Sequence, residues 1–376
     1  MKLLPVFLFF ALLFSCGPTR EPLIVQPAFY CWETSPDYSN TDLVQSLGAS
    51  RIYLRLFDVA WDAVKKNPYP AGLYRSSWMW GGKTEPVPVI FITNETLLHL
   101  DSSGVAELAQ HIYNKADALL YRVAAFEQED HYWPYGRTEM DTNYSAAQQL
   151  MQKNMTNSEK WLTRIREWQI DCDWTVSTSA KFFYLLTELK RLQPAWSLSC
   201  TIRLHQLKYA EKIGVPPVDR GMLMCYNVDD LKDPDTPNSI FNYAESRKYL
   251  EPAQAYPLPL DVALPAFRWG VLFHLGKFKC IVPEQDWEAY HEQYFEQKTG
   301  NLFQAKSDFT LNDQFVREGD LLRFEVPDQH ELLQMIKLLR RQTLAQPMNL
   351  AFFHLGSNRT SYDHIPNLQA LVAAFR

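Results

Sequence analysis

Eight short apolar stretches, separated by longer amphipathic or polar segments, are the feature that most constrains the fold of this chain. The stretches cover residues 23–32, 51–57, 87–93, 168–175, 197–204, 221–226, 260–267 and 349–354. Residues 105–123 carry Leu108, Ile112, Leu119 and Leu120 at helical spacing, and further helices are expected at 157–166, 180–192, 332–344 and 367–375. Strands that alternate with helices predict an α/β fold, a (β/α)8 TIM barrel. An open doubly wound sheet remains the alternative, because strand count alone does not close a barrel.

Three segments between the expected strands are longer than ordinary loops, namely 58–85, 126–145 and 280–326. Residues 126–145 are rich in aromatic and charged residues and include Trp133. The last segment separates the seventh and eighth strands and contains a helix-like piece and alternating runs that predict a small β-structure. We therefore expect residues 17–376 to form a single barrel domain with insertions at about 126–145 and 280–326.

The first 16 residues have the pattern of a targeting segment. Lys2 is followed by an apolar run that is too short to span a bilayer, and residues 13–17 then resemble a bacterial lipobox. Cleavage before Cys16 would leave that residue as the site of lipid attachment. An ordinary secretory signal and an uncleaved N-terminal anchor remain alternatives. The expected location is the bacterial cell envelope, periplasmic or at the outer membrane, with the membrane contacted through the N-terminal lipid.

Composition excludes some partners and leaves others open. The net charge of −6 and the lack of a basic stripe argue against nucleic acid. The 14% of aromatic residues, with 11 Trp and 19 Tyr, suits a protein that stacks sugars on rings, and suits a large aromatic core equally well. Motifs for a metal hydrolase, a nucleotide cofactor or a serine nucleophile are missing, so we expect neither metal nor cofactor. Besides Cys16 we expect buried free cysteines at Cys31, Cys172, Cys200, Cys225 and Cys280.

The fourth expected strand carries two acids at alternate positions. Alternation would direct Asp171, Asp173 and Thr175 to one face of this strand. Two carboxylates on an otherwise apolar strand are costly unless they line a cavity or find partners, for which Arg55 and Arg203 are candidates. A ligand role and a purely architectural role are therefore both open.

Other polar and aromatic side chains stand where the expected strands end, which is where a barrel places its site. These candidates are Glu33, Asp58, Glu95, Arg203, His205, Tyr226, Asn227, Asp229, Trp269 and His354.

Two short motifs resemble glycoside hydrolase family 18, the chitinases and endo-N-acetylglucosaminidases. That family has Asp-x-Asp-x-Glu on its fourth strand, where this chain has Asp171, Asp173 and Thr175. It has Met-x-Tyr-Asp/Asn on its sixth strand, where this chain has Met224 to Asn227. The family's Gly-rich third-strand motif and eighth-strand Trp are not evident at 87–94 and 352–354. The layout also resembles a bacterial lipoprotein family of chitinase-like barrels.

The resemblance implies a glycan site in which Tyr226 and Asn227 hold an acetamido group. Thr175 replaces the family's general acid, a loss that costs on the order of 10²–10⁴ in rate. The expected function is binding of an oligosaccharide or polysaccharide, with weak or no hydrolysis. The catalytic candidates are Asp173 and Asp171, and the binding candidates are Glu33, Asp58, Thr175, Arg203, Tyr226, Asn227 and Trp269.

Two other functions remain open. An active hydrolase would need a relocated acid, for which Asp173, Glu33, Asp58, Glu95 and Asp229 are the candidates. A structural module of the envelope would use the barrel acids only as architecture.

Overall fold

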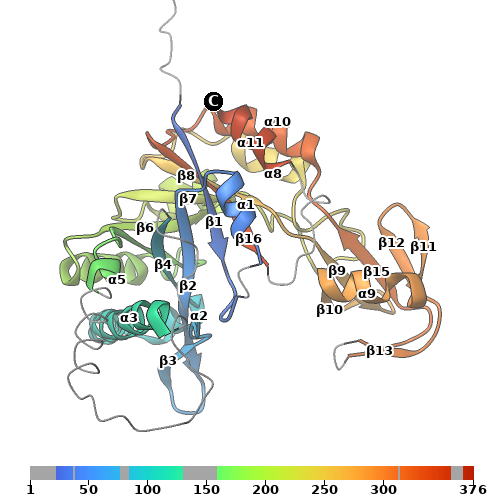
Figure 1. The fold of residues 1–376 in the computed structure, drawn as a ribbon, viewed down its shortest axis with the longest axis horizontal. Coiled ribbons are helices and arrows are strands. Elements are labelled where there is room, and N and C mark those ends of the chain that lie inside the picture. Colours follow the sequence, from blue (N-terminus) through green and yellow to red (C-terminus); the bar gives the residue numbers. More distant parts are fainter. Residues whose placement is uncertain (1–22, 37–38, 77–83, 130–158, 312–313, 357–366) are drawn as a thin grey trace, which may run out of the picture.

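The protein folds around a closed barrel of eight parallel strands (Figure 1). The computed structural model describes residues 23–36, 39–76, 84–129, 159–311, 314–356 and 367–376. The barrel strands are β1 (Val25–Cys31), β2 (Arg51–Asp62), β4 (Glu85–Ile92), β5 (Glu167–Asp171), β6 (Ser197–Arg203), β7 (Arg220–Met224), β8 (Leu260–Pro265) and β16 (Met348–Leu355). They pair in chain order, and β1 pairs with both β2 and β16, so the sheet has no open edge within the barrel. The prediction of a (β/α)8 barrel is confirmed, and the doubly wound sheet is excluded.

The barrel strands follow the apolar runs because most of their side chains are buried on both faces. Two expected boundaries were wrong. The second strand continues to Asp62 and forms a hairpin with β3 (Asn67–Ala71). The fourth strand ends at Asp171, four residues earlier than expected, because Trp174 leaves the barrel wall and stacks on Phe182 of α5 at 4.9 Å.

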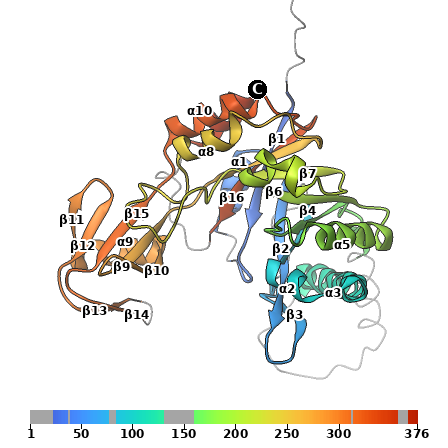
Figure 2. The ribbon, with the colours of Figure 1, turned by 180° about the vertical axis from the view of Figure 1, so that it is seen from behind.

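Helices cover the outside of the barrel. They are α1 (Thr41–Ser46), α2 (Asn94–His99), α3 (Ser102–Glu129), α5 (Ser179–Leu192), α6 (Leu204–Lys208), α7 (Ala210–Ile213), α8 (Tyr243–Leu250), α10 (Gln329–Leu339) and α11 (Leu368–Phe375). The helices α3 and α5 lie side by side, and α8, α10 and α11 form a second group at the end of the barrel where the C-terminus lies (Figures 1 and 2). Among the described residues, none of these helices combines the length and apolar character that crossing a bilayer requires.

The expected insertion between the seventh and eighth strands of the barrel is present. It begins before residue 280, and consists of β9 (Trp269–His274), β10 (Lys277–Pro283), α9 (Glu284–Tyr294), β11 (Phe295–Thr299), β12 (Leu302–Ala305), β13 (Phe309–Leu311), β14 (Gln314–Val316) and β15 (Leu321–Glu325). Five of these strands form an antiparallel sheet in the order β10-β9-β15-β12-β11, which stands beside the barrel (Figure 1). A separate apolar cluster around Leu272, Trp287 and Leu322 forms its core.

Ion pairs fill the barrel interior where the strands begin. Arg51 on β2 contacts Glu167 at 2.6 Å, and Arg220 on β7 contacts Asp261 at 3.0 Å. Burial raises the pKa of both Glu167 and Asp261, against the effect of these arginines. Charges at this end of a barrel serve stability. The candidate site residues lie at the opposite end of the barrel, where the strands end.

Several predictions concern residues outside the described ranges. They include the signal segment, Cys16 and the 126–145 insertion with Trp133, apart from the end of α3 at Glu129. The cysteines that are described are free, and Cys31, Cys172, Cys200 and Cys225 are buried while Cys280 is half-buried.

Candidate functional site

A forked ion pair lies where β5 and β6 end. Arg203 donates from Nε to Oδ1 of Asp173 at 2.6 Å and from Nη2 to Oδ2 at 3.3 Å. Arg203 is the last residue of β6, and Asp173 follows β5, so parallel pairing of these neighbouring strands brings the two together. The Asp173 side chain keeps 48% of its surface exposed. The pair can therefore meet a ligand, but the carboxylate already has a cationic partner.

Asp171 is the buried member of the two acids. Its Oδ1 accepts a hydrogen bond from Thr201 Oγ1 at 2.6 Å, inside the barrel. Burial raises the pKa of Asp171 to about 6, while Arg203 and Thr201 act in the opposite direction and the neighbouring Asp173 and Asp58 add to the rise. A carboxyl group with this pKa exchanges its proton close to neutral pH, which suits a general acid.

Asp58 lies near these acids with a partner of its own. Arg55 donates from Nε to Oδ1 of Asp58 at 2.8 Å, and a second, shorter contact joins Nη2 to Oδ2. The same guanidinium donates to the backbone oxygen of Trp32 at 3.3 Å and lies 5.4 Å from the centre of its ring. Arg55 thus pairs with Asp58, whereas Arg203 pairs with Asp173.

Five aromatic side chains form a floor across the end of the barrel. Phe353 of β16 is at its centre, with its ring 4.7 Å from Tyr226, 5.5 Å from Trp32, 5.6 Å from Tyr30 and 5.7 Å from Phe267. We call these residues the aromatic floor. Tyr30, Tyr226 and Phe267 are buried, so Trp32 and Phe353 are the members that keep exposed apolar surface, of the kind on which sugar rings stack.

A cavity of about 270 Å³ opens above part of this floor. It lies between the ends of the barrel strands and the insertion, and we call it the junction cavity. Its walls include Glu33, Asn227, Phe267, Arg268, Trp269, Ile281, Pro283, Glu284, Gln285, Phe353, His354 and Gly356. Three of the predicted binding residues, Glu33, Asn227 and Trp269, are thus brought together here. Arg268 is fixed in the wall by Glu284 at 2.7 Å and by Glu288.

A smaller cavity of about 70 Å³ lies beside it, and Asn227 lines both. The smaller cavity also contains Arg203, Tyr226 and His205 in its lining. Tyr226 is buried, and its hydroxyl donates to Met224 Sδ at 3.4 Å, a weak acceptor. Asn227 has a positive φ of 52°, a conformation that asparagine tolerates better than most residues, and its N–H donates to Ile240 O at 2.7 Å.

Thr175 is not on the strand with the two acids. It lies in the turn before α5, where its hydroxyl is 2.9 Å from Ser177 Oγ and its N–H donates to Thr178 Oγ1 at 2.9 Å. The expected common face of Asp171, Asp173 and Thr175 was wrong, because the strand ends at Asp171 and Asp173 is already in the following loop.

The other acids considered as replacements lie outside the walls of the junction cavity. Glu95 is exposed on α2, 3.9 Å from His99. Asp229 accepts a hydrogen bond from Asn242 Nδ2 at 3.4 Å in the loop after β7. Within the described ranges, no group of three or more His, Cys, Asp and Glu side chains has a geometry that suits a metal ion.

The sequence interpretation missed the centre of the floor. Phe353 stands at the end of the eighth barrel strand, where a Trp was sought, and Tyr30, Trp32 and Phe267 complete its surroundings. Their positions at the ends of the first, seventh and eighth strands were the signal that could have identified them. Thr201 lies two residues before Arg203 on β6, so alternation along this strand could have identified it.

Comparison with known proteins gives only distant similarities. No family model matches the chain, and no curated protein matches it. A chitinase from Chromobacterium violaceum is 10% identical, with 93% of this chain and 98% of that one covered and a TM-score of 0.49. The spore cortex-lytic enzyme SleL of Bacillus cereus is 13% identical, with 94% and 75% covered and a TM-score of 0.45. The fold assignment comes from the strand pairing of this chain itself, and no activity is transferred from either protein.

Proposed function

We propose that this protein binds an oligosaccharide or polysaccharide containing amino sugars, at the ends of the barrel strands, with little or no hydrolysis. The observation that carries the proposal is the junction cavity beside the aromatic floor. Ring faces there adjoin Glu33, Asn227 and Arg268, which can hydrogen-bond hydroxyl and acetamido groups. Ligand sites combine apolar walls with a few converging polar groups in this way.

The state of the acids supports binding over cleavage. Glycoside cleavage needs one carboxyl group that protonates the leaving oxygen and a second group that stabilises the sugar cation. Asp173 is held by the forked contact from Arg203, and Thr175 stands in place of the glutamate that the motif would supply. A threonine hydroxyl cannot act as that acid at neutral pH.

A thermal-shift experiment on the chain after Cys16 tests the proposal. Chitin, peptidoglycan and N-glycan oligosaccharides are the probes, because a ligand that binds only the folded state raises the melting temperature. We expect a rise with an amino-sugar oligomer that is smaller in Tyr226→Phe, together with unchanged oligomer length on product analysis. If none of these glycans raises the melting temperature, the proposal fails and the architectural role of a structural envelope module gains weight.

One observation favours active hydrolysis as a second candidate. Asp171 has a pKa of about 6, which suits a general acid, although the hydrogen bond from Thr201 favours the ionised carboxylate. In that case turnover of the bound oligomer would fall with rising pH near 6 and would disappear in Asp171→Asn. Unchanged turnover in Asp171→Asn, tested beside Asp173→Asn, would remove Asp171 from such a mechanism.

We also propose that the protein is exported and held to a membrane of the bacterial envelope by a lipid on Cys16. The support is the sequence of residues 1–17 alone. Fractionation of cells fed a labelled fatty acid tests it. Label and membrane association should both disappear in Cys16→Ser. Label that persists in this variant would contradict the lipid site.

A further inference from the structure

A single buried carboxylate joins the insertion to the barrel. Glu325 is the last residue of β15 and is 0% exposed. Its Oε2 accepts hydrogen bonds from Trp269 Nε1 at 2.8 Å, from Ser239 Oγ at 2.6 Å and from the Ile240 N–H at 3.3 Å. Trp269 begins the insertion, whereas Ser239 and Ile240 belong to the barrel loop between β7 and α8.

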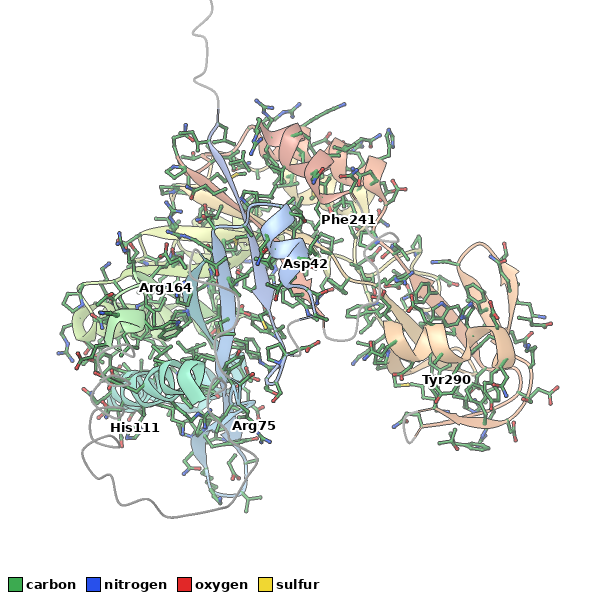
Figure 3. All side chains as sticks on the ribbon, viewed as in Figure 1. Asp42, Arg75, His111, Arg164, Phe241 and Tyr290 are labelled. Atoms are coloured by element: carbon green, nitrogen blue, oxygen red, sulfur yellow. The ribbon has the colours of Figure 1, made fainter. Side chains whose placement is uncertain are left out.

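Arg323 completes this contact from the same strand. Its Nε donates to Glu325 Oε1 at 2.6 Å, so the buried charge is paired. The rest of the guanidinium donates to three backbone oxygens of the barrel loop, those of Leu231, Asp233 and Pro234, at 3.3, 2.7 and 3.2 Å. Figure 3 labels Phe241 on this loop and Tyr290 on α9, on the two sides of the junction. The ion pair therefore belongs to the insertion and binds the loop.

The Glu325 carboxylate does not line the junction cavity, but hydrogen bonds connect it to two residues of the cavity wall. Trp269, its direct donor, is a wall of the cavity. Asn227, another wall residue, donates its N–H to Ile240 O at 2.7 Å, and the Ile240 N–H donates to Glu325. The two walls thus share one buried acceptor, and Arg323 adds three hydrogen bonds to the same loop.

We infer that Glu325 is a positioning residue for ligand binding at the junction cavity, acting through Trp269 and through the loop that carries Asn227. The inference rests on the proposed function. A buried carboxylate that accepts four hydrogen bonds, one of them from its arginine partner, has one arrangement of low free energy, because any other leaves a buried polar group without a partner. Glu325 therefore holds the wall from the insertion and the wall from the barrel in one geometry before the ligand arrives.

The test compares Glu325→Gln with a matched control, Asp320→Asn. Asp320 is also a buried carboxylate of the insertion, 2% exposed, and it contacts His274 at 2.5 Å and Lys279 at 3.5 Å, away from the cavity. With the chitin oligomer as probe in calorimetry, Glu325→Gln should weaken binding about tenfold or more, a change typical of a lost buried charge contact. Asp320→Asn should leave the affinity within about twofold, since distant sites act independently.

Two readouts separate positioning from a general loss of stability. In a double-mutant cycle with Trp269→Phe, the effects of Glu325→Gln and Trp269→Phe on affinity should be less than additive, because both act on the same wall. The indole N–H resonance of Trp269, assigned by its loss in Trp269→Phe, should shift in Glu325→Gln and stay in place in Asp320→Asn. Ser239→Ala removes one hydrogen-bond donor to Glu325 and keeps the ion pair with Arg323, so it should shift the Trp269 resonance less. This variant replaces Glu325→Gln in the test if Glu325→Gln does not fold.

Additive effects in the cycle, or an unmoved Trp269 resonance in Glu325→Gln, would overturn the inference. An equal loss of affinity in Asp320→Asn would also overturn it, because the role of Glu325 would then be structural only. If the native protein binds none of the glycans, the proposed function fails. The resonance measurement still decides whether Glu325 positions Trp269, so the two failures are distinguishable.

Discussion

Arg203 and Asp173 form a two-point contact at the end of the barrel, Nε to Oδ1 at 2.6 Å and Nη2 to Oδ2 at 3.3 Å. Forked arginine–carboxylate contacts fix both side chains in one plane. Asp173 is half exposed, so a ligand at the strand ends would meet an ion pair and not an isolated carboxylate. Arg203 also affects Asp171, because its charge opposes the rise of that pKa.

Replacement of Arg203 should change the ionisation of Asp171. In Arg203→Met we expect the pKa of Asp171 to rise above its value of about 6, because the cation that favours the ionised form is gone while burial remains. A carbon-detected NMR titration of the Asp171 carboxyl group measures this. Lys190→Met, which breaks a surface pair with Asp219, is the control and should leave the titration unchanged. An unaltered curve in Arg203→Met would contradict the prediction.

The raised pKa of Asp171 should make the protein less stable as the pH increases. The usual value is 3.8 and the folded value about 6, so between these pH values the folded state retains a proton that the unfolded state has released. The free energy of unfolding should therefore fall through this window, by roughly 3 kcal/mol from this group. Below about pH 3, where the folded and unfolded states both bind the proton, the contribution is fully present.

Urea unfolding between pH 4 and 7 checks this sign. Buried Glu167 and Asp261 also have raised pKa values, so the decisive quantity is the difference between the native protein and Asp171→Asn. The variant should show a shallower decline than the native protein. Parallel curves for the native protein and Asp171→Asn would refute the prediction.

Loss of the Tyr226 hydroxyl should affect binding more than stability. That hydroxyl donates only to a sulfur atom, so Tyr226→Phe should change the free energy of unfolding by less than about 1 kcal/mol. Glycan affinity should drop severalfold, because Tyr226 lines the smaller cavity at the proposed site. The matched control is Tyr256→Phe, whose buried hydroxyl has no hydrogen-bond partner among the described residues. It should be neutral or stabilising, with native affinity. Calorimetry and thermal unfolding of both variants decide the matter.

Phe353 should contribute both packing and a binding face. Phe353→Ala should destabilise the fold by about 2–4 kcal/mol, because the ring contacts four other members of the floor. Phe353→Leu preserves most of the volume and should cost less than about 1.5 kcal/mol, yet it should weaken glycan binding because the aromatic face is lost. Phe182→Leu, which alters the stack with Trp174 outside the barrel, should lower stability alone. Native glycan affinity in Phe353→Leu would argue against the floor as a sugar platform.

The barrel could be predicted because its strands are buried on both faces, which leaves continuous apolar runs in the sequence. The residue at which β5 ends could not be predicted from the sequence. Trp174 continues the apolar pattern of the strand, but its ring packs against α5, and a sequence does not distinguish an apolar residue in the wall from one that has left it. The misplacement of Thr175 follows from that single boundary.

The site could be predicted in part for a related reason. Parallel strands end on one face of the barrel, so Glu33, Asn227 and Trp269 were expected near one another, and they line one cavity. Which arginine binds Asp173 depends on strand register, which the sequence does not contain. Glu325 had no signal at all, because its importance arises from the antiparallel pairing of β15 with β9 inside the insertion.

The direction in which the chain enters the barrel has a consequence for access. The described chain begins at Leu23 and enters β1 at the end of the barrel near the C-terminus (Figure 1). The barrel residues that line the junction cavity lie at the other end, where the strands finish. Six residues separate Leu23 from Cys16, a reach of at most about 25 Å when extended. If Cys16 carries a lipid, the barrel stays within this distance of the bilayer. The chain would then lead from the bilayer to the end of the barrel where the strands begin, and the junction cavity would lie at the other end.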